Sequence, residues 1–130
     1  MIKNEHVIEM DFWGRTHSID LVFRVFPNGI VSDIQLNTYE EFLKKKEEIL
    51  QDVYDKLKAF VIENYPDDEK INNFNVFRYY KPKAIFVKNS VTKKRVMGIF
   101  FDFRFDMEND IVAYIEDEKV IQIGTQDIIL

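Results

Sequence analysis

The clearest hydrophobic pattern in the chain lies in residues 95–115. Apolar side chains recur at every second position from Met97 to Phe105, and most of the residues between them are polar. A period of two predicts a β-strand with one buried face and one mostly polar face. Residues 107–110 are polar and typical of a turn, and residues 111–115 indicate a returning strand. We therefore predict a long β-hairpin with an aromatic buried face.

A second alternating pattern predicts an N-terminal hairpin. Residues 6–13 and 18–26 each place apolar side chains on one face, and residues 14–17 between them are expected to form the turn. Pro27-Asn28-Gly29 is a strong turn signal, because proline presets φ and glycine accepts positive φ. Shorter apolar runs predict further strands over residues 30–34, 84–88 and 120–123.

Apolar positions at helical spacing predict one long helix over residues 38–65. Thr38 and Glu41 match a capping box at its start. Pro66 is expected to end the helix, because the residue before a proline is disfavoured in the α region. Residues 71–83 show no clean period, and Pro82 argues against a continuous helix or strand through them.

These elements predict an α+β fold in a single domain over residues 1–130. The expected architecture is one antiparallel sheet of about five to seven strands with the long helix packed on one face. The alternative is a small β-sandwich with the helix at one end.

Composition narrows the possible functions. The chain has 130 residues and no cysteine, which excludes disulfides and thiolate chemistry. Its net charge of −5 argues against nucleic-acid binding, which needs clustered cations, and is compatible with a basic protein partner. The N-terminus lacks the apolar segment of a signal peptide, and no apolar run reaches the ~20 residues of a membrane span. We therefore expect a cytoplasmic protein.

Four carboxylates lie near the turn predicted at residues 107–110: Asp102, Asp106, Glu108 and Asp110. They could form a cation site, or Asp106 and Glu108 could act as an acid–base pair. Calcium loops need closer, fixed ligand spacing and a turn glycine that is missing here, so a solvated turn is favoured. The two histidines lack a third metal ligand, and phosphate-loop and serine-nucleophile glycine patterns are absent. No metal or cofactor is expected.

Aromatic and acidic residues are the candidates for partner binding. Trp13 is either an interface anchor or an ordinary core aromatic. Tyr79 and Tyr80 are either an exposed aromatic patch or part of a flap that covers the end of the sheet. Acidic residues gather near the helix end and near the C-terminal turns, and turns at one end of a sheet would form an acidic rim that steers a basic partner. The alternative is that these residues are ordinary solubilising charges. The candidate partner-binding residues are Trp13, Tyr79, Tyr80, Asp106, Glu108, Asp117 and Glu118.

Scattered residues along most of the chain carry a family resemblance. They are Trp13, Gly14, Gln35, Tyr39, Phe42, Glu47 or Glu48, Ile49, Gly98, Ile99, Phe101, Asp106, Glu108, Val120, Ile123, Gly124, Asp127 and Ile128. In this pattern the chain resembles a family of bacterial domains of unknown function that carry a Trp-Asp-x-Glu-His-Gly hairpin. Phe105, Asn109 and Asp110 replace the tryptophan, histidine and second glycine of that motif, so the resemblance implies a turn rather than a catalytic cluster. Some members look like stand-alone proteins near polymorphic-toxin loci, which implies an immunity-type binding role.

The sequence therefore predicts a non-enzymatic protein-binding domain of a bacterial cytoplasmic protein, in its most specific form an immunity-type inhibitor of a basic toxin. The alternative is a small enzyme or ligand-binding domain that uses Asp106 and Glu108. A concave pocket lined by these carboxylates, with a raised pKa, would favour that alternative.

Overall fold

The computed structural model describes residues 4–26, 29–67, 73–89 and 93–129. Its six strands form one sheet, and their order in the sheet is their order in the chain. The strands are β1 (Glu5–Phe12), β2 (Arg15–Phe23), β3 (Tyr80–Val87), β4 (Val96–Phe103), β5 (Asp106–Glu116) and β6 (Lys119–Thr125). The helices are α1 (Asp33–Lys44), α2 (Lys46–Asn64), the single turn α3 (Val76–Tyr79) and the 3-10 turn η2 (Gln126–Ile128). The α+β class is confirmed.

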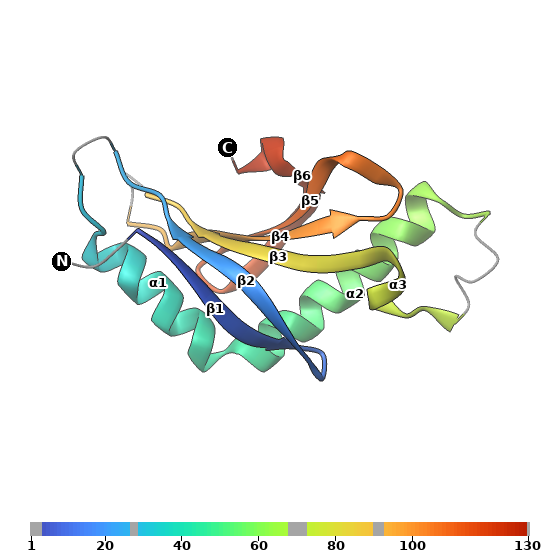
Figure 1. The fold of residues 1–130 in the computed structure, drawn as a ribbon, viewed down its shortest axis with the longest axis horizontal. Coiled ribbons are helices and arrows are strands. Elements are labelled where there is room, and N and C mark those ends of the chain that lie inside the picture. Colours follow the sequence, from blue (N-terminus) through green and yellow to red (C-terminus); the bar gives the residue numbers. More distant parts are fainter. Residues whose placement is uncertain (1–3, 27–28, 68–72, 90–92, 130) are drawn as a thin grey trace.

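The sheet lies above α1 and α2 in Figure 1, so the domain has two layers. One strand pair departs from the expected antiparallel sheet, because β2 and β3 are parallel over Asp20–Phe23 and Ala84–Val87. The segment between them, including α1 and α2, carries the chain across one face, so β3 enters beside β2 in the same direction. The described strands form one mixed, mostly antiparallel sheet, not the two sheets of the alternative sandwich.

The single long helix predicted over residues 38–65 is wrong in two respects. The helical segment starts earlier, because Ser32 caps α1 and exchanges capping-box hydrogen bonds with Gln35. It is also interrupted at Lys45, whose backbone has φ −111° and ψ 16°. Between Phe42 and Ile49 no side chain is buried, so the sheet does not hold this turn in a straight helix.

The predicted N-terminal hairpin is present, but its turn is tighter than expected. Phe12 pairs directly with Arg15, which leaves Trp13 and Gly14 as a two-residue loop. Both have positive φ, 51° and 85°, as a type I′ turn requires. The short strand expected over residues 30–34 is absent, because residues 30–32 have no regular structure and α1 begins at Asp33.

Strand β3 runs through Pro82, against the expectation for residues 71–83. The pairing with β4 shifts register between Pro82 and Ala84, and β2 pairs with β3 only from Ala84 onward. Pro82 therefore lies beyond the β2–β3 ladder, where its missing N–H costs no ladder hydrogen bond on that side.

The central hairpin is confirmed, with its turn three residues earlier than predicted. Phe103 pairs with Asp106, so the turn is Arg104–Phe105 and residues 107–110 belong to β5. Strand β4 is buried on both faces. On the helix side Phe101 and Phe103 join the main core, as predicted. On the other side the residue after η2, Ile129, covers Phe100 and Val112.

Candidate protein-binding surface

The face of the sheet opposite α1 and α2, here called the outer face, is open over β1 and β2. Met10 and Phe12 of β1 are buried on the helix side, so the alternate residues Glu5, Val7 and Glu9 lie on the outer face. C-terminal residues cover the outer face over β4 and β5, where Ile129 packs on Phe100 and Val112. The same face over β1 and β2 carries mainly exposed side chains.

A hollow of about 470 Å³ lies on this surface, and we call it the outer-face hollow. The pairing register explains its composition, since Glu5 lies opposite Val22 and Val7 opposite Asp20. Val22 in turn pairs with Phe86 of β3. The residues that line the hollow are Glu5, His6, Val7, Asp20, Val22 and Phe86. It combines an apolar surface with two carboxylates, and Val7 is 74% exposed.

The charged residues on the outer face of β1 and β2 are all acidic. The outer-face positions of β1 and β2 are Glu5, Val7, Glu9, Asp11, Thr16, Ser18, Asp20 and Val22. Four of these are carboxylates and none is a cation. Within the described residues, none of the four carboxylates forms an ion pair. Their potential therefore adds up over this part of the outer face and favours a basic ligand.

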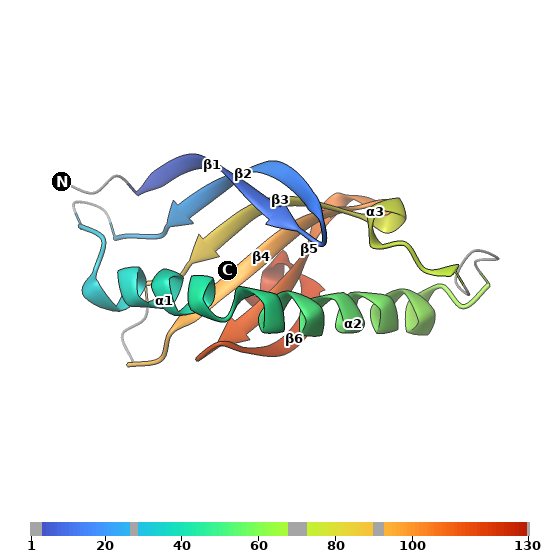
Figure 2. The ribbon, with the colours of Figure 1, turned by 90° about the horizontal axis from the view of Figure 1, so that it is seen from below.

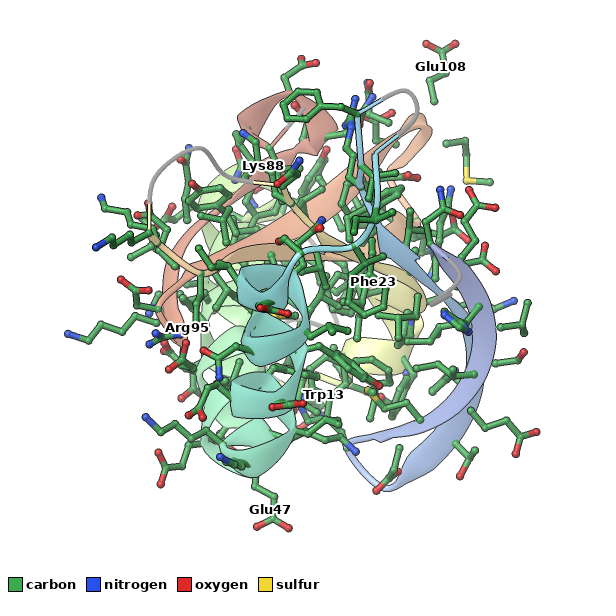
Figure 3. The ribbon with its side chains drawn as sticks, turned by 90° about the vertical axis from the view of Figure 1, so that its left-hand side faces the viewer. Trp13, Phe23, Glu47, Lys88, Arg95 and Glu108 are labelled. Carbon is green, nitrogen blue, oxygen red and sulfur yellow. The ribbon has the colours of Figure 1, made fainter. Side chains whose placement is uncertain are left out.

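Trp13, for which the sequence left open an interface anchor or an ordinary core aromatic, packs into the layer between the sheet and α2. Its indole N–H donates to the carbonyl of Leu50 at 2.8 Å. Its ring stacks on Phe101 at 6.0 Å and meets Tyr54 edge-on at 5.9 Å. These contacts show that the half-buried Trp13 side chain packs within the fold. Figure 3 shows it between the helix and the N-terminal hairpin.

Tyr79 and Tyr80 do not form an exposed patch, because both are almost fully buried. Tyr79 stacks on Phe74 at 5.5 Å. The Tyr80 hydroxyl donates to the carbonyl of Leu57 at 3.0 Å, and burial raises the pKa of this phenol. Tyr80 thus connects β3 to α2, and Tyr79 packs against a residue of the segment that follows α2.

Asp106 and Glu108, which the sequence offers as an acid–base pair only in the disfavoured alternative to a solvated turn, lie at the start of β5. One Asp106 oxygen accepts from the backbone N–H of Glu108 and of Asn109, at 3.1 and 3.0 Å. The other accepts from the side-chain amide of Asn109, and these bonds, with the side-chain amide foremost, lower the pKa of Asp106. That direction is opposite to the raised pKa expected of a general acid. The Glu108 side chain is exposed and points away from the molecule in Figure 3.

Asp117 and Glu118 form the β5–β6 turn, and both have positive φ. Glu118 accepts from Nε and Nη2 of Arg95 at 2.7 and 2.9 Å, and its side chain is only 6% exposed. Asp117 accepts from the backbone N–H of Arg95 at 3.0 Å. Both carboxylates thus hold the start of β4 against the turn, and Glu118 has little surface left for a partner.

The predicted acidic rim divides into two separate regions. Asp106 begins β5 and Asp117 follows its end, so the 11 residues of the strand separate them by about 35 Å. Asp110 is paired with Lys83 at 2.9 Å, which neutralises part of the charge at the first end. Asp68 and Glu69, assigned to the same rim, lie outside the described residues. The expectation that these turns share one end of the sheet is wrong.

The outer-face hollow was not singled out from the sequence, although a signal existed. The alternation in residues 5–12 places Glu5, Glu9 and Asp11 on one face of a strand, opposite the apolar residues. What the sequence does not show is that β3 lies beside β2 and brings Phe86 next to Val22. The described residues contain no group of three or more side chains that could hold a metal ion. None of the described helices has the length and apolar character needed to cross a membrane.

The fold and this surface define a small two-layer α+β domain with an open, acidic sheet face. By comparison with known families, the chain belongs to the family described as a domain of unknown function (DUF6985), whose model matches residues 2–130. Membership in a family of unknown function is thus confirmed, while the hairpin motif and the link to toxin loci remain predictions. Neither the curated proteins nor the solved structures gave a match.

Proposed function

We propose that this chain is a non-enzymatic protein-binding domain that binds a basic protein partner through the outer face of β1, β2 and β3. The observation that carries the proposal is the outer-face hollow, where Val7, Val22 and Phe86 lie beside the carboxylates of Glu5 and Asp20. Protein interfaces combine apolar residues that are desolvated on binding with a polar surround. The hollow has this composition on an exposed surface.

Charge supports a basic partner rather than a neutral one. The four outer-face carboxylates of β1 and β2 have no cation among them to neutralise their field. Such a field raises the association rate of a basic protein, while the apolar contacts limit its dissociation. The net charge of −5 acts in the same direction at longer range.

The most specific form of the proposal is an immunity-type inhibitor of a basic toxin in the cytoplasm of a bacterium. The resemblance to small proteins near polymorphic-toxin loci supports it, and so does the acidic outer face, because a tight inhibitor of a basic enzyme gains from fast association. This form predicts that a toxin encoded beside the gene stops the growth of its host when expressed alone. Co-expression of this chain with that toxin should restore growth.

Site-specific photo-crosslinking in the native host tests the proposal. A photoreactive residue replaces Val22 in the hollow, and in a matched variant it replaces Leu43, which is 45% exposed on α1. We expect a basic protein to crosslink at position 22 and not at position 43. Crosslinks of equal yield at both positions, or none at position 22, would contradict the proposal.

The alternative of an enzyme that uses Asp106 and Glu108 remains an untested prediction. The hydrogen bonds that lower the pKa of Asp106 do not support a role as general acid. No other observation in the described residues favours this alternative over a binding domain.

A further inference from the structure

The backbone of β1 presents a row of hydrogen-bonding groups at the edge of the sheet. The carbonyl of Asn4 accepts from the N–H of Phe23 at 2.7 Å. In an antiparallel pair the residues that bond to the neighbouring strand alternate, so the even-numbered residues of β1 bond to β2. The N–H and C=O groups of Glu5, Val7, Glu9 and Asp11 therefore point away from β2.

That direction leads out of the sheet. Strand β1 is first in the strand order, and β2 is its only neighbour there. In Figure 2 no other described ribbon runs along the outer side of β1. An exposed strand edge of this length is a template for another strand.

The side chains of β1 specify what such a strand must carry. On the outer face Glu5, Glu9 and Asp11 place carboxylates at alternate positions. On the helix side Ile8 is only partly buried and packs against the main core. A strand added beside β1 would therefore meet carboxylates on one face and apolar surface on the other.

We infer that β1 accepts an extended segment of the basic partner as a seventh strand of the six-stranded sheet. The inference rests on the proposed function and specifies how the partner binds. The segment carries lysine or arginine at alternate positions, facing the carboxylates of β1, and apolar side chains between them, covering Ile8. Backbone hydrogen bonds to Glu5, Val7, Glu9 and Asp11 align the segment, and the charges select it.

A second copy of this chain does not fit the same edge. Antiparallel pairing of β1 with another β1 would bring carboxylates of the two chains opposite or diagonal to one another, which is destabilising. The charges on β1 thus oppose self-association and favour a basic strand.

A synthetic peptide serves as the probe. It alternates lysine and valine over the length of β1, and a control peptide of the same composition carries its lysines in one block. We expect the alternating peptide to bind the full chain at least about tenfold more tightly than the control, since the control cannot satisfy both faces. Equal affinity for the two peptides, or no binding of the alternating peptide, would overturn the inference.

Amide hydrogen exchange distinguishes strand addition from simple charge attraction, because charge attraction alone would not slow the exchange of alternate β1 amides. In the free protein the amides of Glu5, Val7, Glu9 and Asp11 should exchange faster than the intervening amides, which β2 protects. We expect saturating alternating peptide to slow these four amides at least about tenfold, because they become ladder donors. Binding of the peptide without this alternating protection would overturn strand addition.

The variants Val7→Pro and Val7→Thr isolate the backbone contribution. Proline removes an N–H that points away from β2, so the β1–β2 ladder keeps its hydrogen bonds, whereas threonine keeps that N–H. We expect Val7→Pro to weaken peptide binding at least about tenfold relative to Val7→Thr. Slow exchange of the even-numbered amides of β1 verifies that the β1–β2 hairpin is intact in both variants.

Equal peptide binding by the two variants would contradict strand addition. The crosslink at position 22 is a separate test, which decides whether the outer face binds a partner at all.

Discussion

At the scale of single residues, the clearest distinction is between acidic residues that hold the fold and those available to a ligand. Glu118 is acidic, lies in a turn and was predicted to face a partner, yet its side chain is nearly buried against Arg95. Glu5 and Glu9 lie in a strand, away from any turn, and both are exposed. Residue type and turn position therefore do not distinguish structural carboxylates from exposed ones, because the partner of each carboxylate depends on strand pairing.

Replacement of Glu118 by glutamine tests its structural role. The change removes the charge that faces the Arg95 guanidinium and one of the two acceptors, so we expect a loss of about 1–2 kcal/mol in the free energy of unfolding. The matched control is Asp52→Asn in the Lys56–Asp52 pair, where both side chains are at least 40% exposed. It should cost less than about 0.5 kcal/mol. Equal losses in urea unfolding would show that Glu118 is an ordinary surface carboxylate.

Asp106 is predicted to make stability depend on pH at the acidic end. Its folded pKa is lowered from 3.8 by hydrogen bonds from Asn109 and Glu108, so its contribution is present above that value and is lost as pH falls through the folded pKa. The difference in unfolding free energy between the wild type and Asp106→Ala should be constant above pH about 5 and shrink below 3.8. A difference that grows on acidification would contradict this account.

At the scale of elements, local patterns predicted the hairpins, and contacts distant in sequence decided the rest. The alternation in residues 95–115 and 6–26 correctly indicated the central and N-terminal hairpins, because a period of two is a local property of a strand with one buried face. The turns were displaced by a few residues. Phe105 looks like part of the alternating strand, but it lies in the β4–β5 turn and stacks on Tyr65 at 4.6 Å.

The start of the helical segment illustrates why a local signal can mislead. Thr38 and Glu41 match a capping box, but Thr38 lies inside α1, where its hydroxyl donates to the carbonyl of Ile34. The true box uses Ser32 and Gln35. Gln35 is fully buried because its amide also donates to the carbonyls of Arg24 and Val87, at 2.6 and 3.2 Å. Those two partners lie after β2 and at the end of β3, which no local pattern reveals.

Replacement of Gln35 by alanine should destabilise the domain strongly. It leaves the carbonyls of Arg24 and Val87 without this donor and removes the capping-box acceptor, so we expect a loss of about 2–4 kcal/mol in the free energy of unfolding. Gln51→Ala on the exposed face of α2 is the matched control and should change stability by less than about 0.5 kcal/mol. A loss below about 1 kcal/mol for Gln35→Ala in urea unfolding would mean that water replaces the lost hydrogen bonds without cost.

At the scale of the whole molecule, the acidic composition is compatible with a basic partner, but it does not predict the surface on which we propose that such a partner binds. The net charge of −5 is a property of composition, whereas the position of the unpaired carboxylates depends on the sheet. The parallel pairing of β2 with β3 brings Phe86 to Val22, and Ile129 closes the outer face over Phe100. Both contacts join residues far apart in the chain. Together they leave the apolar and acidic surface of β1 to β3 exposed.

The central claim is that this outer face binds a basic protein. The most direct test is the association rate of the crosslinked partner, once purified, with two charge-reversal variants at low and high salt. Glu5→Lys with Asp20→Lys reverses two carboxylates at the hollow, and Glu47→Lys with Glu48→Lys reverses two on α2, where Figure 3 shows Glu47 far from the outer face. Both variants have the same net charge, so the comparison isolates position.

We predict that the first variant associates at least about tenfold more slowly than the second at low salt, with the difference shrinking as salt screens the charges. Equal association rates for the two variants at every salt concentration would contradict the claim that the partner docks on the outer face of β1, β2 and β3.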